Sequence, residues 1–258
     1  MREVYLGLKL AFSYFSIFPV RFKDSNDLNS QKVLRYMILL FPFVGFVLGF
    51  LTIEVYKLID YDIPYVSCVA ASLGYMIFYG FIHTEAVVDV VDAIYAKMSG
   101  KDPYKIIKEP TVGALGVLWG VCVVIIKVSL VSYMLYRSLY YEFLSVVVIS
   151  RMVLVMMIKY ADFKSSFVNS LKKSLENASF YLVMSVFFLF GIWLDGFGFI
   201  SLLVLGAVFG AVLFMVIKDK LGFANGDVLG FSLELTEIVL FFSVLLEVGR
   251  ETVWLLPS

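Results

Sequence analysis

The sequence predicts an all-α fold: a polytopic integral membrane bundle of about seven transmembrane helices, with additional amphipathic or interfacial helices. Hydrophobic residues make up 61% of the 258 residues, and charged residues make up only 16%. Ordinary water-soluble domains do not have this composition. The apolar residues also gather in runs of about 20, which is the length a helix needs to cross the hydrocarbon core. A lipid bilayer is therefore expected to be the main solvent for much of the chain.

Seven segments satisfy this length rule, and each is expected to form one span. They cover residues 36–55, 63–82, 112–135, 139–158, 178–194, 199–217 and 228–246. The fourth contains Arg151, and the last contains both Glu234 and Glu237. A charge inside a span costs about 2.5 to 3.5 kcal/mol, so the two glutamates are expected to face a cavity, a cation, or Lys127 and Arg151.

The distribution of lysine and arginine predicts the orientation of the spans. Residues 1–35 mix apolar and charged side chains without a small-residue cleavage site, which indicates an interfacial or re-entrant arm rather than a signal peptide. If this arm is cytoplasmic, the inward segments carry 16 lysines and arginines and the outward segments carry three. Positive charge of this kind marks the cytoplasmic side. We therefore expect a single domain, residues 1–258, in the cytoplasmic (inner) membrane.

The remaining composition excludes several other classes of site and partner. Cys68 and Cys122 lie in separate apolar runs without metal-ligand spacing, so neither a disulfide framework nor a zinc site is expected. The formal net charge is zero, which gives no reason to expect a nucleic-acid partner. No internal repeat or linker is visible. A homo-oligomer remains open.

An acidic stretch, HTEAVVDVVDAIYAK, occupies residues 83–97 directly after an apolar run. If it is helical, Glu85, Asp89 and Asp92 stand at positions i, i+4 and i+7 and share a stripe about 60° wide. Three carboxylates on one face repel one another unless a cation lies between them. Magnesium accepts such oxygens and usually keeps waters and substrate phosphates as its other ligands. The stripe therefore predicts a magnesium site for a phosphate ester or diphosphate within a cytoplasmic segment, residues 83–111.

A simpler interpretation makes this stretch an amphipathic interfacial helix. In that case the carboxylates are its wet face, and its valines and isoleucine, Val87, Val88, Val91 and Ile94, point into lipid. Basic residues usually supply the wet face on an anionic inner leaflet, so we favour the metal site. His83 falls on a different helix face from the carboxylates, and both an interfacial hydrogen-bonding role and a catalytic role are open to it.

A second polar cluster, GFANGDVLG at residues 222–230, precedes the last apolar run. Alternating spans place it on the same side of the membrane as the acidic stretch. Gly226 and Gly230 allow close backbone approach, and Asp227 is explained most simply as a helix N-cap. If the helix begins near Gly226, Asp227 and Glu234 lie on one face.

These clusters resemble the motifs of the cobalamin synthase family of integral-membrane adenosylcobinamide-GDP ribazoletransferases. The family's acidic motif, His-x-Asp-Gly-x-x-Asp-x-x-Asp-Gly, corresponds to His83, Glu85, Ala86, Asp89, Asp92 and Ala93. Its Gly-Asp-Val-Leu-Gly and Glu-Leu-x-Glu motifs correspond to residues 226–230 and to Glu234, Leu235 and Glu237. The stretches FPFVGFVLG at 41–49 and VGALGVL at 112–118 also fit in order. Glu85 replaces an aspartate, Ala86 and Ala93 replace glycines, and Thr111 and Ile17 stand where the family has arginines.

The resemblance implies the nucleotide-loop assembly step of cobalamin biosynthesis. A ribose hydroxyl of α-ribazole, or of its 5′-phosphate, attacks the corrinoid-side phosphorus of adenosylcobinamide-GDP, and GMP leaves. In this assignment Mg²⁺ is held by Glu85, Asp89, Asp92 and Asp227, and His83 or Asp227 accepts the hydroxyl proton. The expected substrate-binding residues are Asn225, Gly226, Glu234, Glu237, Arg151 and Lys108.

Two other classes of membrane protein remain as alternatives. The first half of the CDP-alcohol phosphotransferase signature, Asp-x-x-Asp-Gly-x-x-Ala-Arg, is imitated by Asp89, Asp92, Ala93, Ala96 and Lys97. Its second half is missing, because Ile106, Pro110 and Ala114 stand at the required glycine and aspartates. A transporter or channel would use Glu234, Glu237, Lys127 and Arg151 as a substrate or ion path, but no inverted repeat supports it.

Overall fold

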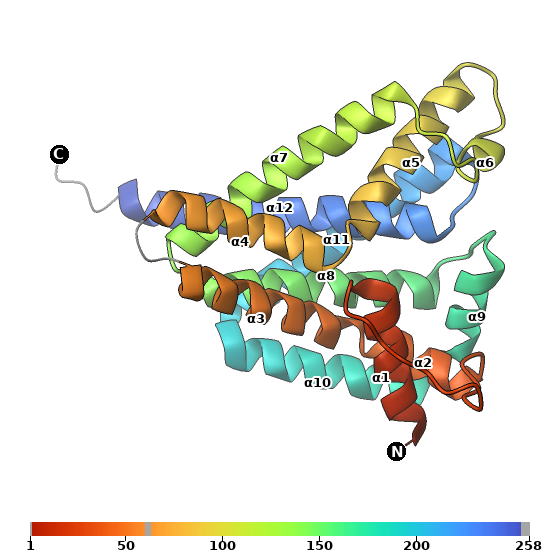
Figure 1. Cartoon of the computed structure of the whole chain (residues 1–258), viewed down its shortest axis with the longest axis horizontal. Helices are drawn as coiled ribbons and strands as arrows, with labels where there is room; N and C mark the ends of the chain where they lie inside the picture. The colour runs from red at the N-terminus through yellow and green to blue at the C-terminus, as the bar shows by residue number, and fades with distance from the viewer. Residues whose placement is uncertain (1, 60–62, 254–258) are drawn as a thin grey trace.

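The computed structural model describes residues 2–59 and 63–253, and within these residues every regular element is an α-helix (Figure 1). This confirms the predicted fold class. The helices are α1 (Arg2–Phe15), α2 (Gln31–Leu39), α3 (Phe41–Ile59), α4 (Pro64–Phe78), α5 (Ile82–Met98), α6 (Pro103–Ile106), α7 (Ala114–Tyr136), α8 (Tyr140–Tyr160), α9 (Ser166–Ser174), α10 (Asn177–Asp195), α11 (Phe197–Leu221) and α12 (Gly226–Val253).

Six of the described helices, α3, α7, α8, α10, α11 and α12, are long and apolar enough to cross a membrane. Helix α4 has only 15 residues, and it passes the same test only together with α5, from which it is bent by 74°. Counting the bent pair as one span gives seven. The protein is therefore multi-pass, as the apolar runs predict.

Two predicted spans have different bounds in the structure. The first was expected at residues 36–55, but α2 ends at Leu39 and the spanning helix α3 begins only at Phe41. The second was expected at 63–82, but α4 ends at Phe78. Hydropathy averages over a window, so it does not detect a helix break that lies within an apolar run.

A Schellman motif ends α4 and produces the bend before α5. The N–H of Gly80 donates to Ile77 O (2.8 Å) and the N–H of Phe81 donates to Met76 O (3.1 Å). Gly80 has φ 67° and Phe81 has φ 55°. Glycine adopts this left-handed conformation readily, whereas a phenylalanine there costs about 1–2 kcal/mol. The acidic stretch is consequently a separate helix with its own direction.

Helix α8 lies at the centre of the bundle and packs against α3, α10, α11 and α12. Small residues bring its neighbours close, as is usual for helices in membranes. A Cβ on Gly45 of α3 would lie 2.6 Å from Arg151 Cδ, and one on Gly210 of α11 would lie 2.8 Å from Met157 Cε and Val153 Cγ1. Gly45 belongs to the FPFVGFVLG stretch, whose role is thus to let α3 approach Arg151.

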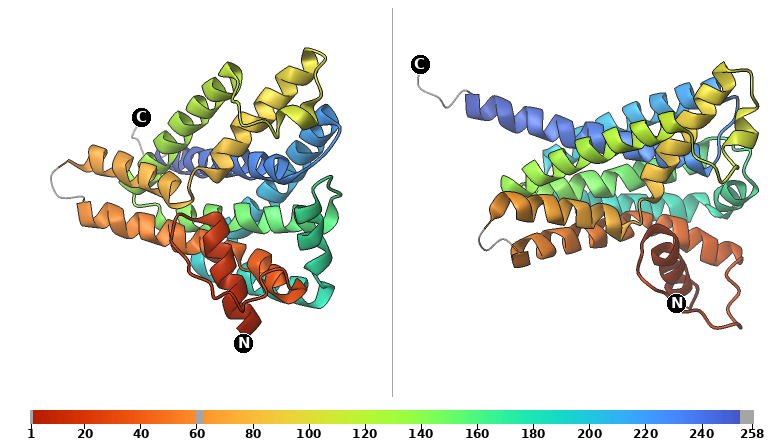
Figure 2. Two further views of the ribbon diagram at one scale, coloured as in Figure 1. Left: turned by 45° about the vertical axis from the view of Figure 1, so that its right-hand side comes forward. Right: turned by 45° about the horizontal axis from the view of Figure 1, so that its top comes forward.

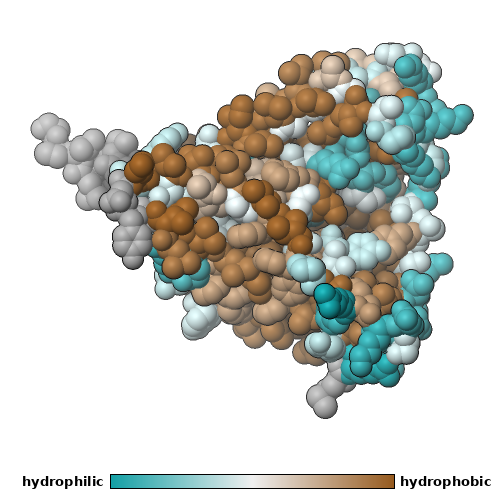
Figure 3. Space-filling view, viewed as in Figure 1, coloured by the Kyte–Doolittle hydropathy of each residue, from teal (hydrophilic) through white to brown (hydrophobic). Residues whose placement is uncertain are grey.

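The polar segments gather at one end of the bundle. Helices α2, α6 and α9 and the connection from α11 to α12 lie at the end opposite the C-terminus, and the turned views agree (Figures 1 and 2). In the space-filling view hydrophilic residues concentrate at this end, while the body is hydrophobic (Figure 3). The acidic stretch and the 222–230 cluster are therefore at the same end, as the alternating spans predict.

Candidate active site

The acidic stretch forms the helix that its spacing predicts, α5. Glu85 and Asp89 line a cavity of about 460 Å³ between α5 and α7, whose other walls are mainly apolar residues of α7. On the opposite face, Val87 (0% exposed) and Val91 (6%) are buried in the core. The interpretation of α5 as an interfacial helix with its valines in lipid is therefore wrong. That face of α5 packs against α12 instead.

Asp92 connects α5 to the beginning of α7. One of its carboxylate oxygens accepts the N–H of Gly113 (2.5 Å) and the other accepts the N–H of Gly116 (2.8 Å). A Cβ on either glycine would lie within 2.6 Å of this carboxylate, and one on Gly120 would lie 2.7 Å from Val88 Cγ2. Glycine is therefore required at these positions of the VGALGVLWG segment, because α7 packs closely on α5 there. Sequence reasoning did not anticipate this role for Asp92.

The second cluster forms the first turn of α12. Asn225 Oδ1 accepts the N–H of Val228 (3.1 Å), and Asn225 Nδ2 donates to Asp227 Oδ2 (2.6 Å). The N-cap is thus Asn225, and the simpler explanation of Asp227 as the cap is wrong. A Cβ on Gly230 would lie 2.7 Å from Ala86 Cβ, so α12 crosses α5 at this pair. Gly226 has no neighbour within 4 Å of its Cβ position, so the expected close approach holds only for Gly230.

The two clusters meet as a concentration of negative charge. Burial, together with the charges of Asp227, Glu85 and Asp92, raises the pKa of Asp89 to about 6. This group lies in α5, beyond the bend that follows α4 and outside the six helices that are long and apolar enough to span a membrane by themselves. Among the ion pairs of the described residues, none involves Glu85, Asp89 or Asp227. Like charges that are close and unneutralised favour the binding of a cation.

The carboxylates do not form a complete metal site by themselves. Within the described residues, no group of three or more His, Cys, Asp or Glu side chains converges as a metal cluster. Magnesium is usually held by one or two carboxylates together with substrate phosphates. Glu85, Asp89 and Asp227 fit this arrangement, because they supply carboxylates without an ion-pair partner from two contacting helices. The substrate would supply the missing oxygens.

A buried network joins α7, α8 and α12 and reaches the first turn of α5 through Thr84. Lys127 Nζ lies 2.8 Å from Glu234 Oε2 and 2.5 Å from Glu237 Oε2, and Arg151 pairs with the other oxygen of Glu237. All four side chains are at most 1% exposed. The network contains two cations and two anions. This confirms that the two carboxylates of the last span face Lys127 and Arg151.

The network also holds the bend between α4 and α5. Tyr79, just after α4, donates its hydroxyl to Glu234 Oε1 (3.0 Å), and Thr84, in the first turn of α5, donates to the same oxygen (3.1 Å). One carboxylate thus fixes both sides of the strained Gly80–Phe81 turn. This gives Glu234 a structural role in directing the acidic stripe, and its expected contact with substrate stays a prediction.

His83 is buried rather than interfacial. It is 4% exposed, and its ring stacks on Tyr79 with centroids 5.5 Å apart. It lines a second cavity, of about 190 Å³, together with Asp227. This cavity lies on the side of α5 that faces α1 and α9, away from α7. Asp227 lines this second cavity, and its charge acts on Asp89, which lines the first.

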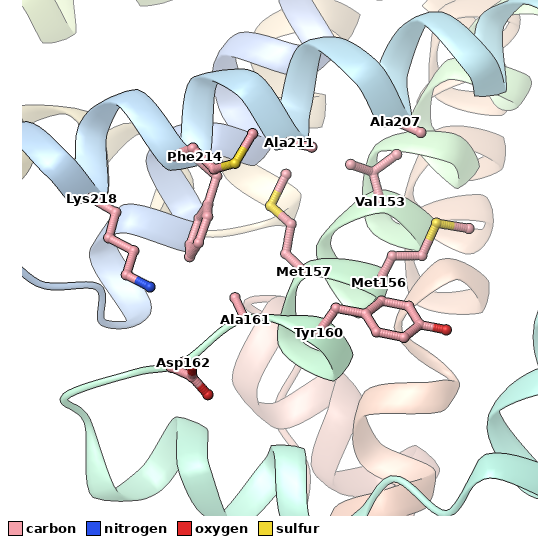
Figure 4. A pocket seen from close by; sticks show the side chains of 11 residues that line it. Val153, Met156, Met157, Tyr160, Ala161, Asp162, Ala207, Ala211, Phe214 and Lys218 are labelled. Carbon is pink, nitrogen blue, oxygen red and sulfur yellow. The ribbon is translucent and has the colours of Figure 1, made fainter.

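Two remaining features lie apart from the carboxylates. Lys108 is exposed in the connection between α6 and α7, with its Nζ 4.1 Å from the centroid of the Tyr104 ring. A third cavity, of about 370 Å³, lies between α8 and α11, with Met156, Met157 and Phe214 in its walls and Lys218 at its rim (Figure 4). None of the predicted site residues lines it.

The order of these motifs along the chain can be compared with known families. The model of the cobalamin-5-phosphate synthase family matches residues 7–245. The chain belongs to this family. Membership decides against the CDP-alcohol phosphotransferase and transporter alternatives. The two clusters that the fold brings into contact, on α5 and at the start of α12, both lie within the matched residues.

Individual relatives are similar over nearly their whole length. The adenosylcobinamide-GDP ribazoletransferase of Clostridium botulinum is 26% identical over 256 residues, which cover 95% of this chain and 99% of that protein. The protein of the same name from Chlorobium chlorochromatii is 27% identical over 255 residues, 92% of this chain and 94% of that protein. No solved structure matches the chain significantly.

Proposed function

We propose that this protein is an adenosylcobinamide-GDP ribazoletransferase. It transfers the adenosylcobinamide-phosphate group of adenosylcobinamide-GDP to α-ribazole or its 5′-phosphate, and GMP is the second product. The observation that carries the proposal is the contact between the two family motifs, which places Glu85, Asp89 and Asp227 together at the polar end of the bundle. The similarity to the Clostridium botulinum and Chlorobium chlorochromatii proteins of this name covers 95% and 92% of the chain.

In this proposal the diphosphate of the donor lies beside Glu85 and Asp89, at the cavity between α5 and α7. The ribose hydroxyl of the acceptor forms a bond to the corrinoid-side phosphorus. The bond from that phosphorus to the bridging oxygen breaks, and GMP leaves with the electron pair. The hydroxyl proton passes to Asp227, in the first turn of α12, whose charge acts on Asp89. Transfer of this kind depends mainly on positioning and charge neutralisation.

Glu85, Asp89 and Asp227 would hold Mg²⁺, which when bound neutralises the charge that develops on the diphosphate oxygens. Asp92 would contribute mainly by fixing α7 on α5, because both of its oxygens accept backbone N–H groups. Asn225 and Gly226 at the start of α12, and Lys108 in the connection between α6 and α7, are proposed to contact the substrates. Glu234, Glu237 and Arg151 would support the site through the buried network that holds the bend between α4 and α5.

We also propose that the site faces the cytoplasm across the inner membrane. The support is the excess of lysine and arginine at the end of the bundle where the site lies. Residues 1–35 would then form a cytoplasmic or interfacial arm, whose helix α1 packs on α2.

The test is GMP release by the purified protein in lipid nanodiscs supplied with adenosylcobinamide-GDP, α-ribazole and Mg²⁺. Asp89→Asn is expected to lower kcat by at least about a hundredfold, because it removes a charge that acts at the reacting group. Glu54→Gln is the matched control, because Glu54 pairs with Lys57 on α3, outside the site. Release of GMP by Asp89→Asn at the rate of the control would overturn the assignment.

A further inference from the structure

The cavity of about 370 Å³ between α8 and α11 has no role in the chemistry described so far. Both helices are long and apolar enough to span the membrane, and none of the predicted site residues lines the cavity. Its volume lies within the range of about 300–1,000 Å³ that is usual for a bound small molecule. Met157 points from α8 toward α11, and Phe214 points from α11 toward α8 (Figure 4). A ligand between these helices would not touch the carboxylates of α5 and α12.

The cavity is closed toward α12 and open on another side. A Cβ on Gly210 of α11 would lie 2.8 Å from Met157 Cε and Val153 Cγ1 of α8 and 3.1 Å from Thr236 Oγ1 of α12. The three helices therefore meet there without space for a ligand. Met215 and Tyr160 also line the cavity, but they are 53% and 63% exposed. An opening between two spanning helices faces the bilayer, so the molecule that enters it comes from the lipid phase.

The inner walls of the cavity are apolar and adaptable. Ala207 and Ala211 lie four residues apart and share one face of α11, where their small side chains leave room for a ligand. Val153 and Met156 line the α8 side. Methionine is flexible and polarizable and adapts to irregular shapes. These walls suit an acyl chain, which is apolar and has no fixed shape, better than a planar or polar ligand.

The polar residues of the cavity form a basic rim. Tyr160, Asp162 and Lys218 lie where α8 and α11 end, at the polar end of the bundle. Asp162 already has a cation, because Lys172 Nζ lies 2.7 Å from its Oδ1. Lys218 extends toward the chain that follows α8 (Figure 4), and no ion pair among the described residues includes it. With two lysines and one carboxylate, the rim has one positive charge in excess.

Two tyrosines lie at the level of this rim. The hydroxyl of Tyr160 lies 3.1 Å from that of Tyr181, near the start of α10, and both rings are exposed. Tyrosine is enriched at the interface between the bilayer and water, where its ring is in contact with lipid and its hydroxyl is wet. The rim therefore lies at the depth of the lipid head groups, and the apolar walls lie at the depth of the acyl chains.

We propose that this cavity binds one anionic phospholipid from the leaflet at the polar end of the bundle. One acyl chain lies between α8 and α11, and the phosphate of the head group pairs with Lys218. Basic pockets between membrane helices bind anionic lipid head groups in this way. A free phosphate would leave the apolar walls empty, whereas a phospholipid fills both parts of the cavity. This binding does not depend on the transferase reaction, because the proposed metal-binding and proton-accepting residues line other cavities.

The first test is photocrosslinking in phosphatidylcholine nanodiscs that contain a small fraction of a lipid with a diazirine in its acyl chain. The probe lipid is either phosphatidylglycerol or phosphatidylcholine, and labelled peptides are identified by mass spectrometry. Phosphatidylglycerol should label residues 153–162 and 207–218 about fivefold more than phosphatidylcholine, which is the effect of one basic residue on an anionic lipid. Both probes should label the exposed face of α7 around Leu118 and Ile126 equally.

The second test separates the rim from the walls. Lys218→Gln should reduce the preference for phosphatidylglycerol to the value measured on α7. Lys220→Gln, two residues later on the same helix and outside the cavity, should keep it. Ala211→Phe fills the cavity and should remove labelling of α8 by both probes. Val208→Phe is the matched control, because Val208 is exposed on α11 and does not line the cavity.

Equal labelling of the cavity by the two probes in the wild type would overturn the proposal. An unchanged preference in Lys218→Gln would do so as well, and this surface substitution leaves the packed core intact. A wild type without lipid labelling at residues 153–162, as expected if a second copy of the chain covers the cavity, would also contradict it. Loss of labelling in Ala211→Phe supports the proposal when labelling of α7 is unchanged in the same sample.

Discussion

Helix α12 carries two groups of charged side chains that differ in how their charge is balanced. Toward the middle of the helix, Glu234 and Glu237 are fully buried and paired with Lys127 and Arg151. At its first turn, Asp227 joins Glu85 and Asp89, and no described cation pairs with any of them. The buried group is neutral, and the outer group has surplus negative charge. We call the buried group, Glu234, Glu237, Lys127 and Arg151, the frame, because its paired charges hold the helices together. The outer group, Asp227, Glu85 and Asp89, is open to a cation and a substrate.

The difference has an energetic cause. In a low-dielectric interior an unpaired charge is too costly to keep, so the buried carboxylates must have partners. Near the polar end, water reduces this penalty, and carboxylates without a partner can persist. Substitutions in the frame should therefore act first on stability, and substitutions in the outer group should act first on activity.

The largest expected effect is in the frame. Lys127→Met leaves Glu234 and Glu237 with a single cation, Arg151, and should lower the free energy of unfolding by about 3–5 kcal/mol. The measurement is denaturant-induced or thermal unfolding in detergent. Lys127→Met combined with Glu234→Gln restores neutrality and should recover a large part of the loss. Equal stability of the single and double variants would argue against the frame.

The next effect concerns the crossing that brings the frame and the site together. Gly230→Ala places a Cβ 2.7 Å from that of Ala86 and must push α12 away from α5. We expect a loss of about 1–3 kcal/mol in stability and a lower rate of GMP release. Gly74→Ala is the control, since nothing lies within 4 Å of its Cβ position. If both variants melt like the wild type, the close crossing is wrong.

A substitution of Asp92 tests whether this residue stabilises the fold or binds the metal. Asp92→Asn keeps one acceptor for the N-terminal N–H groups of α7 but loses the charge, which should cost about 1 kcal/mol in stability. Thermal unfolding and GMP release are measured on the same sample. A large loss of activity without any loss of stability would instead make Asp92 a metal ligand.

The smallest effect is the pH dependence of the outer group. With its pKa at about 6, Asp89 stays protonated in the folded protein over a range in which the unfolded chain, at about 3.9, is already ionised. The difference between the two pKa values of Asp89 therefore lowers the free energy of unfolding as pH rises from about 4 to 6 in metal-free buffer. Asp89 is partly exposed, so the effect should stay below about 1 kcal/mol. The melting-temperature difference between Asp89→Asn and wild type should grow over this range, and a constant difference would contradict it.

Much of this organisation could be predicted from the sequence. Apolar runs of sufficient length indicate the spans, the i, i+4, i+7 spacing indicates the acidic face of α5, and the cost of charge in a span requires partners for Glu234 and Glu237. These rules depend on local composition or on one helix. They are therefore readable without knowledge of the tertiary structure.

The missed features depend on contacts between distant segments. The bend at Gly80 and Phe81 combines a glycine that hydropathy ignores with a phenylalanine in an unfavourable conformation, which Glu234 helps to hold. The contact between Asp92 and the start of α7 joins residues 21 and 24 positions apart. Glycines at 113, 116 and 120 were a usable signal, because small residues at helical spacing mark close helix packing. The 190 Å³ cavity is lined by residues of α1, α2, α5, α8, α9 and α12, and no local pattern predicts it.

The central claim is that the outer group binds a divalent cation together with the substrate diphosphate, whereas the frame binds none. Titration of Mn²⁺ into the protein in nanodiscs, followed by its electron paramagnetic resonance signal in the presence of adenosylcobinamide-GDP, tests it directly. We expect one site that is lost in Asp89→Asn and retained in the Glu54→Gln control. Retention of that site with unchanged affinity in Asp89→Asn would contradict the account.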